Sequence, residues 1–259
     1  MKKLIALLLA AVMLLCTAAA LAAEPIDLST YTDAELEALR VQVAEEIAAR
    51  RRAATASPAA DFRYVSNGTE VRIVEYVGNG GDVVIPDMLD GVPVTQIGER
   101  AFYDKEIVSL QLPAGLISLG DTSVGWNFDW KGVLVLPETV QSIEWGAFYG
   151  TGLQGIVIQS SCKIQASAFF HSLSDFCYIR EGCAVSISRG AFNSGIKTIV
   201  IPADVKVISA GAFEGCQKLT VYCPAGSYAE QYCRENFIVC NTAEYEAMVA
   251  YYEALYPAQ

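Results

Sequence analysis

The chain has 259 residues, with 18 Lys or Arg, 29 Asp or Glu and a single His, so its formal net charge at pH 7 is −11. Such a negative field repels nucleic acid and anionic membrane surfaces, and we expect neither as a partner. The length suits one large domain or two small ones.

The first 23 residues have the composition of an export signal. Lys2 and Lys3 form a basic start, residues 4–15 are almost all apolar, and "AAALAA" follows. This layout predicts a secretory signal peptide over residues 1–23, because about 12 strongly apolar residues fall short of the ~20 that span a bilayer. Cys16 would suit a lipid anchor, but "MLLC" places Leu where a small residue is needed. Loss of Lys2 and Lys3 leaves 16 basic and 29 acidic side chains, a net charge of −13. We therefore expect a secreted or cell-surface protein, with no membrane insertion once the signal is removed.

Residues 24–54 have a helical pattern. Thr32 and Glu35 form a capping box, and apolar residues recur at helical spacing at Leu36, Leu39, Val43 and Ile47. The small, proline-bearing segment at residues 55–61 is typical of a linker.

A short unit then recurs over residues 62–240. An Ala-Phe pair is followed by a turn and by an apolar strand that ends at Pro or an equivalent residue. The strand ends, spaced 21 to 27 residues apart, are Pro86, Pro113, Pro137, Gln159, Arg180, Pro202 and Pro224. The Ala-Phe pairs end at Phe102, Phe148, Phe169, Phe192 and Phe213. A period of this length with one short strand per unit is the signature of a leucine-rich solenoid.

The strands contain two apolar columns, because the first and third residues before each strand end are apolar in every copy. The first column is Ile85, Leu112, Leu136, Ile158, Ile179, Ile201 and Cys223, and the second is Val83, Leu110, Leu134, Ile156, Cys177, Ile199 and Val221. A single short strand cannot bury its apolar face, whereas stacked coils bury equivalent positions together. We expect both columns in the core, although the register near "DFCYIR" is open by one residue.

Residues 241–259 are predicted to form a C-terminal helix, with Tyr245, Met248, Tyr252 and Leu255 as one apolar stripe. The predicted fold is thus α/β: a leucine-rich repeat solenoid of about seven coils with a parallel sheet, an N-terminal helix and a C-terminal helical cap.

Three stretches resemble the BspA-like leucine-rich repeat family. "GGDVVIPDMLDGVPVTQIGERAF" is similar to the opening unit of these proteins, the recurring "AF…IVIP" to their internal unit, and "LTVYCPAGSYAEQYCREN" to the way such arrays close. The resemblance covers roughly residues 62–237, and the copy around "DTSVGWNFDWKG" departs from it because it lacks Ala-Phe. It implies a bacterial surface or secreted setting and adhesion to host or neighbouring cells.

The outward face of the sheet is the first candidate binding surface. Alternate strand residues point away from the core, and these include Phe176, Tyr178, Val200 and Tyr222. They could be strand formers that support one another across the sheet. On a water-exposed solenoid face they would instead anchor a partner, because aromatic residues dominate binding hot spots.

The copy that lacks Ala-Phe is the second candidate. Trp126, Phe128 and Trp130 crowd this segment. They could pack an irregular loop onto the solenoid, or they could form a projecting recognition loop that uses Trp126 and Trp130.

Five of the cysteines fit the repeat as small core or turn residues, and two pairs, Cys162–Cys183 and Cys233–Cys240, could still form disulfides. The single histidine, His171, is predicted to be a turn residue, with no nucleophile or oxyanion loop to make it a catalytic base. We expect no catalytic residue, no cofactor and no metal site.

The sequence therefore predicts an exported, non-enzymatic protein that binds an extracellular protein or a cell-surface glycan through its sheet face. A carbohydrate-binding module and an assembly module that acts through the N-terminal helix remain the alternatives.

Overall fold

The structure is a computed structural model that describes residues 55–193 and 195–257. Residues 55–250 form one compact unit, and residues 251–257 belong to a second. The fold below is that of the first unit. The predicted signal peptide and N-terminal helix lie outside the described residues.

Most elements are short strands arranged in three sheets. The six-stranded sheet contains β8 (Val133–Leu136), β10 (Gly155–Ile158), β12 (Phe176–Ile179), β14 (Thr198–Val200), β16 (Thr220–Tyr222) and β17 (Val239–Asn241). The nine-stranded sheet contains β1 (Phe62–Ser66), β2 (Val71–Tyr76), β4 (Met88–Leu89), β5 (Val92–Ile97), β7 (Ser118–Leu119), β9 (Ser142–Ile143), β11 (Lys163–Ile164), β13 (Ser186–Ile187) and β15 (Val207–Ile208). The two-stranded sheet pairs β3 (Gly81–Val84) with β6 (Ile107–Gln111). The helical elements are η3 (Ala59–Asp61), α3 (Tyr228–Glu235) and α4 (Tyr245–Leu255).

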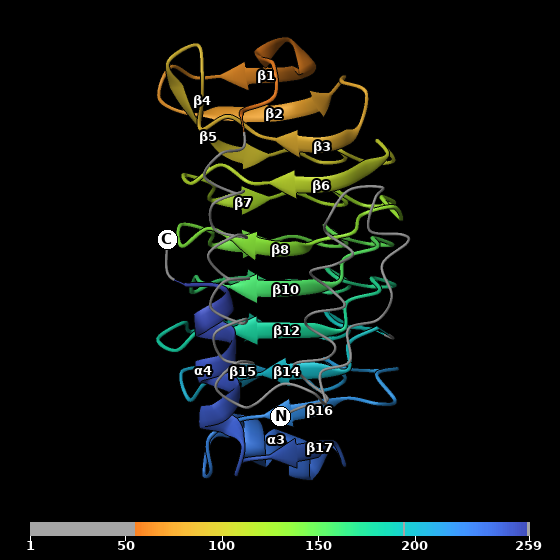
Figure 1. Cartoon of the computed structure of the whole chain (residues 1–259), viewed down its shortest axis with the longest axis vertical. Helices are drawn as coiled ribbons and strands as arrows, with labels where there is room; N and C mark the ends of the chain where they lie inside the picture. The colour runs from red at the N-terminus through yellow and green to blue at the C-terminus, as the bar shows by residue number, and fades with distance from the viewer. Residues whose placement is uncertain (1–54, 194, 258–259) are drawn as a thin grey trace, which may run out of the picture. The chain divides into compact units, whose positions relative to one another are not determined.

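The six-stranded sheet is parallel throughout and runs in the order β17-β16-β14-β12-β10-β8. The nine-stranded sheet is parallel from β2 to β15, with antiparallel pairs β1–β2 and β4–β5. Figure 1 shows the strands of successive coils one above another. Each central coil therefore gives one strand to each of these two sheets, which confirms the predicted parallel-sheet solenoid.

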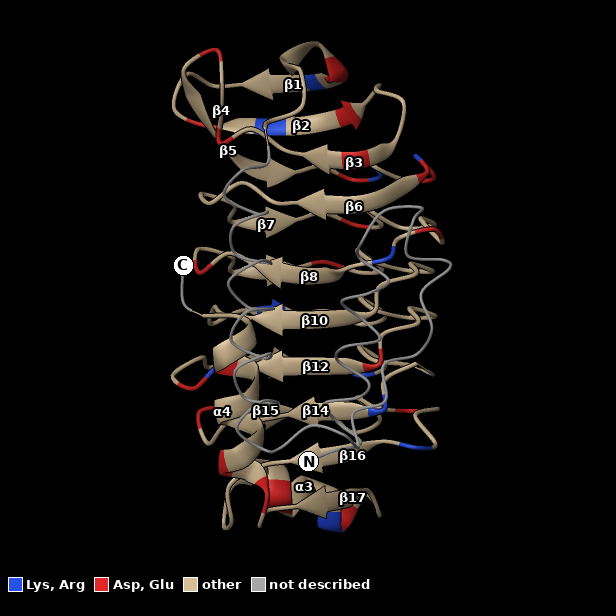
Figure 2. Cartoon of the chain, viewed as in Figure 1, with Lys and Arg blue, Asp and Glu red and all other residues tan. Residues whose placement is uncertain are grey.

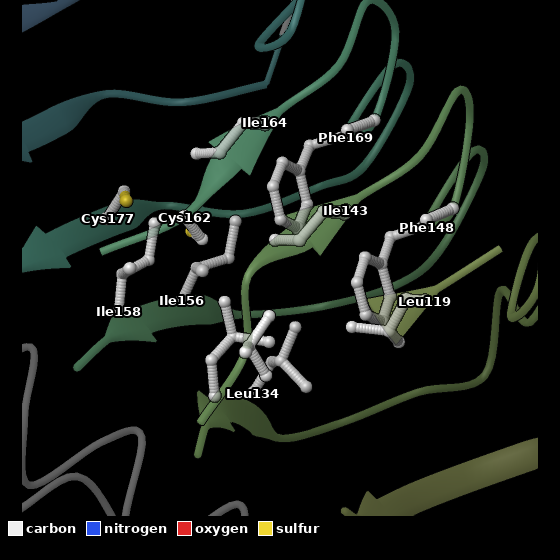
Figure 3. Packing of buried hydrophobic residues seen from close by; sticks show 14 of the residues in the cluster. Leu119, Leu134, Ile143, Phe148, Ile156, Ile158, Cys162, Ile164, Phe169 and Cys177 are labelled. Atoms are coloured by element: carbon white, nitrogen blue, oxygen red, sulfur yellow. The ribbon is translucent and has the colours of Figure 1, made fainter. Parts of the chain in front are cut away.

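The register of the strands matches the predicted columns. Cys177 pairs with Ile156 on β10 and with Ile199 on β14, and all three are fully buried. The alignment of "DFCYIR" used for the prediction was therefore correct. Figure 3 shows Ile156 and Cys177 turned into the core that also contains Ile143 and Ile164 of the nine-stranded sheet.

The phenylalanines of the Ala-Phe pairs form a second, aromatic column inside the solenoid. Phe169 stacks on Phe148 at a ring-centroid distance of 5.2 Å and on Phe192 at 5.1 Å, and Phe213 continues the stack 5.8 Å from Phe192. Offset stacking of this kind adds to the gain from burial. The column gives the recurring Phe of the Ala-Phe pair its structural role.

Two turn positions that recur along the solenoid have a left-handed backbone. The first precedes the Ala-Phe pair, with positive φ at Arg100, Thr122, Gly146, Ser167, Gly190 and Gly211. The second lies two residues after the Phe or its equivalent, with positive φ at Asp104, Trp126, Gly150, His171 and Gly215. Glycine adopts this conformation without steric cost, and larger side chains do so with strain.

The C-terminal end of the core is closed by α3. Ser227 caps this helix by accepting a hydrogen bond from Glu230 N at 3.2 Å, and Glu230 Oε2 accepts one from Gly226 N at 2.6 Å. Tyr232 then meets the last phenylalanine, Phe213, edge-on at 6.0 Å. The helix covers the apolar end of the stack, as a capping element must.

At the other end, Ser57 lies in the segment predicted to be a linker. Ser57 N donates to Val84 O at 2.9 Å, and Ser57 Oγ accepts from Val84 N at 3.0 Å. This segment therefore continues the hydrogen bonding of β3.

Candidate functional site

The outward face of the six-stranded sheet is covered at its centre. Register places Val157, Tyr178 and Val200 in one row on β10, β12 and β14, yet all three are fully buried and lie outside the continuous core cluster. The expectation that this face meets water is therefore wrong for Tyr178 and Val200. Phe176 and Tyr222 are half-buried, so they are only partly available.

The first residues of α4 account for part of this cover. Tyr245 is buried, and its hydroxyl donates a hydrogen bond to Glu181 Oε1, just beyond β12, at 3.0 Å. Burial raises the pKa of the Tyr245 hydroxyl, and the adjacent Glu181 carboxylate raises it further. Tyr245, Met248 and Val249 all belong to the buried residues outside the core cluster.

Phe176 also packs within the sheet. A Cβ placed on Gly155, its partner on β10, would collide with the Phe176 ring, so the ring lies over the bare glycine backbone. This contact explains the half-burial of Phe176 and the glycine in the outward row.

Trp130 is a core residue and not a surface anchor. In the coil that lacks Ala-Phe, Val124 takes the place of Phe: its amide bonds to Ala147 O, as Phe148 N bonds to Ala168 O one coil later. The smaller Val leaves space that Trp130 fills, 1% exposed and edge-on to Phe148 at 6.2 Å. Of the two alternatives for Trp130, packing onto the solenoid is therefore the one that the structure supports, and the recognition-loop alternative is wrong for this residue.

Asn127 holds this irregular coil to the preceding one. Its Nδ2 donates to Phe102 O at 2.8 Å and Val124 O at 2.7 Å, and its Oδ1 accepts from Lys105 N at 3.1 Å and Ile107 N at 3.0 Å. The side chain is buried, so these bonds satisfy backbone groups that would otherwise be unpaired. Trp126 and Phe128 are thus attached to a rigid turn.

Trp126 and Phe128 are exposed, at 42% and 57%. Trp126 stacks on Tyr149 at 6.1 Å and an interplanar angle of 20°, and Phe128 meets Trp126 edge-on at 5.3 Å. Tyr149 stacks in turn on Phe170 at 5.2 Å. Tyr103 lies 6.3 Å from Trp126 on the other side.

These five residues, Tyr103, Trp126, Phe128, Tyr149 and Phe170, form what we call the aromatic edge. Sequence reasoning missed three of them. Tyr103, Tyr149 and Phe170 each directly follow an Ala-Phe pair, so the signal was an aromatic residue at the same place in three coils.

Trp126 has an unusual backbone for a bulky residue. Its φ is 63°, at the turn position that other coils fill with Gly150 or Gly215. A large side chain in this conformation is strained, and such strain concentrates at functional sites.

His171 lies in the equivalent turn two coils after Trp126, with φ 54°, as the sequence predicted. Its ring contacts Phe170 edge-on at 4.2 Å and Tyr149 at 5.9 Å. In this environment the imidazole packs against the aromatic edge.

Across residues 55–193 and 195–257, no group of three or more His, Cys, Asp or Glu side chains is placed to hold a metal ion. In the same part of the chain, no helix has the length and apolar character to cross a membrane. An open groove of about 660 Å³ lies beyond the ends of β8, β10 and β12, lined in part by Glu138, Gln159, Arg180 and Glu181.

The cysteines lie mainly in the core. Cys162 and Cys183 occupy equivalent buried positions of neighbouring coils, and burial raises the pKa of the Cys162 thiol to about 11. Cys177 is fully buried in its predicted column.

A family match and one similar solved structure support this architecture. Residues 95–220 match six copies of the BspA type leucine rich repeat region. A leucine-rich repeat protein of T. pallidum has a similar solved structure, with a TM-score of 0.60 and 24% identity over 73% of this chain and 99% of that chain. A leucine rich cell surface protein of Faecalibacterium prausnitzii matches 65% of this chain and 76% of that chain at 18% identity, with a TM-score of 0.27. No curated protein matches the chain.

The matched residues 95–220 contain the whole aromatic column and most of the stacked coils described above. Residues 95–220 of this chain belong to the BspA-type leucine-rich repeat family.

Proposed function

We propose that the protein is exported and binds another protein, without catalysis, through the aromatic edge. The signal-like composition of residues 1–23 supports export. Repeat solenoids offer extended surfaces that suit protein contacts. The sheet face is a weaker candidate because Tyr178 and Val200 are buried.

The conformation of Trp126 is the observation that carries this proposal. An exposed indole occupies a left-handed turn position where glycine would be unstrained. The buried bonds of Asn127 hold the turn in place. A strained, exposed and rigidly held Trp is costly for folding alone, and Trp is enriched at the centres of binding surfaces.

A protein partner fits the aromatic edge better than a glycan. Sugars bind aromatic residues by lying on an open ring face, but the faces of Tyr149 are already turned towards Trp126 and Phe170. Stacked rings present their edges, which suit edge-to-face contacts with the aromatic and aliphatic side chains of a protein.

The absence of catalysis is part of the proposal. His171, the single histidine of the chain, lies in a turn and packs on Phe170 and Tyr149. The lining of the open groove carries both charges: the guanidinium of Arg180 and the carboxylates of Glu138 and Glu181.

The test is a screen of the purified protein against arrayed extracellular proteins and glycans. A variant with Trp126→Gly and Phe128→Ser is compared with a control carrying Trp145→Ser and Phe237→Ser, which also removes two exposed rings, of the same types, outside the aromatic edge. Gly suits the backbone at residue 126, so the first variant should fold.

We expect a protein ligand that binds the parent and the control but binds the Trp126/Phe128 variant at least tenfold more weakly. Equal binding by both variants would place the site elsewhere. Binding to glycans alone would favour the carbohydrate-binding alternative.

A further inference from the structure

The last coil brings three cysteines together at the C-terminal end of the solenoid. Cys223 directly follows β16, Cys233 lies in α3, and Cys240 is the central residue of β17. β16 and β17 are paired, with Val221 opposite Cys240. The Sγ atoms of Cys223 and Cys240 are 3.1 Å apart.

This separation is close to bonding distance. A disulfide needs an S–S distance of about 2.04 Å, so the two sulfur atoms must approach by only about 1 Å. A small side-chain rotation can supply that movement. Burial raises the pKa of the Cys233 thiol, which also interacts with Cys240, and this interaction helps to raise the pKa of Cys233 further. Its backbone, however, is held within α3.

The three thiols differ in access. Cys223 and Cys233 are buried, whereas Cys240 is half-exposed on β17, the last strand of its sheet. Burial raises the pKa of Cys223 to about 12, and the neighbouring Cys240 adds to the rise. An incoming oxidant therefore meets Cys240 first, and Cys223 lies directly behind it.

We propose that Cys223 and Cys240 form a disulfide when the protein meets an oxidising disulfide donor. The Cys240 thiolate attacks one sulfur of the donor, forming a mixed disulfide and releasing one donor thiolate. Cys223 then loses its proton and attacks the Cys240 sulfur, which releases the second donor thiolate. The cysteine pair loses two electrons and two protons, and the donor becomes two thiols.

The bond joins β17 covalently to β16 and closes a loop that contains α3. This loop covers the open end of the apolar stack, where Ala229 and Tyr232 are buried. The link therefore fastens the C-terminal cap. Disulfides of this kind persist outside the reducing cytosol, which agrees with export.

The test maps cysteine connectivity in the purified full chain after equilibration with oxidised glutathione. Under alkylating, non-reducing conditions, combined cleavage after Lys, Arg and Glu places the three cysteines on separate peptides. These are 219–230 with Cys223, 231–234 with Cys233 and 236–244 with Cys240.

We expect peptide 219–230 linked to peptide 236–244 as the main product, with Cys233 alkylated. The variant Cys233→Ala should give the same link, and Cys240→Ser should abolish it. A main link that involves peptide 231–234, or three alkylated cysteines after equilibration, would overturn the proposal.

Thermal unfolding gives a second readout. The oxidised parent should melt at least about 3 °C above the reduced parent, since closing a loop of this size stabilises the folded state. The Cys240→Ser variant should show no such difference between the two conditions. Equal Tm values for oxidised and reduced parent would show that the bond does not fasten the cap.

Discussion

The two large sheets of the solenoid differ in what their outward faces meet. In the nine-stranded sheet the short strands turn Ser118, Ser142, Lys163 and Ser186 outward, and Val207 is 52% exposed. In the six-stranded sheet the equivalent outward row is apolar, and Val200 is fully buried. Figure 2 shows β8, β10, β12 and β14 without charged residues.

This difference shows how the residue pattern of a solenoid strand indicates whether its outward face is covered. Parallel strands that are buried on both faces have continuous apolar runs, such as "GIVI" in β10. In strands with one solvated face, polar residues alternate with apolar ones, as in "SL" and "SI". An apolar outward row therefore indicates a covered face before it indicates an exposed binding surface.

The largest expected effect on stability comes from replacing one valine in each sheet with aspartate. Val200→Asp should lower the free energy of unfolding by about 3 to 5 kcal/mol, because it buries an unpaired carboxylate. Val207→Asp should change it by less than about 0.5 kcal/mol, because this side chain meets water. Urea unfolding of the two variants measures both values, and similar losses would contradict the assignment of the two faces.

The contact between Phe176 and Gly155 sharpens the comparison within the covered row. Gly155→Ala should cost about 1 to 3 kcal/mol, because the new methyl group collides with the Phe176 ring. In a Phe176→Ala background the same change should cost almost nothing. A double-mutant cycle by urea unfolding measures this coupling. Additive effects would show that the ring does not lie on Gly155.

A hydrogen bond at the start of α4 provides a test with a smaller expected effect on stability, and this effect depends on pH. Tyr245→Phe removes the hydrogen bond to Glu181 and should cost about 1 kcal/mol at pH 8. Because folding raises the pKa of Tyr245, its contribution is present below the unfolded pKa of about 10 and is lost as pH rises further. Unfolding measured from pH 8 to pH 11 should therefore show a steeper loss for the parent than for the variant. Tyr228→Phe, at an exposed position, is the matched control.

The smallest expected effect is at the aromatic edge. Trp126→Gly should change the stability by less than about 1 kcal/mol, because relief of backbone strain offsets the lost stacking on Tyr149. Thermal unfolding checks this value. A loss of more than about 3 kcal/mol, typical of a core Trp, would show that Trp126 supports the fold.

The repeated part of the fold could be predicted well from the sequence, because each apolar column recurs in every copy of the repeat. The inward columns, the parallel register at Cys177 and the C-terminal helix were all correct. The capping box at Ser227 and Glu230 also indicates the start of α3, but the prediction did not use this signal.

The candidate site was harder to predict because it depends on contacts between distant segments. Tyr178 is buried although its strand position is outward, and Tyr245, which accounts for part of the cover, lies 67 residues later in the chain (245 − 178). Trp130 is buried because Val124 leaves a space that only packing reveals. The exposure of Trp126 likewise follows from the turn that Asn127 holds.

The most direct measurement is hydroxyl-radical footprinting of the full chain, read by mass spectrometry at residues of the same type. The account predicts rapid oxidation of Trp126 and strong protection of Trp130, and faster oxidation of Tyr103 than of Tyr178. Oxidation of Tyr178 as fast as that of Tyr103, or of Trp130 as fast as that of Trp126, would contradict both the covered sheet face and the exposed aromatic edge.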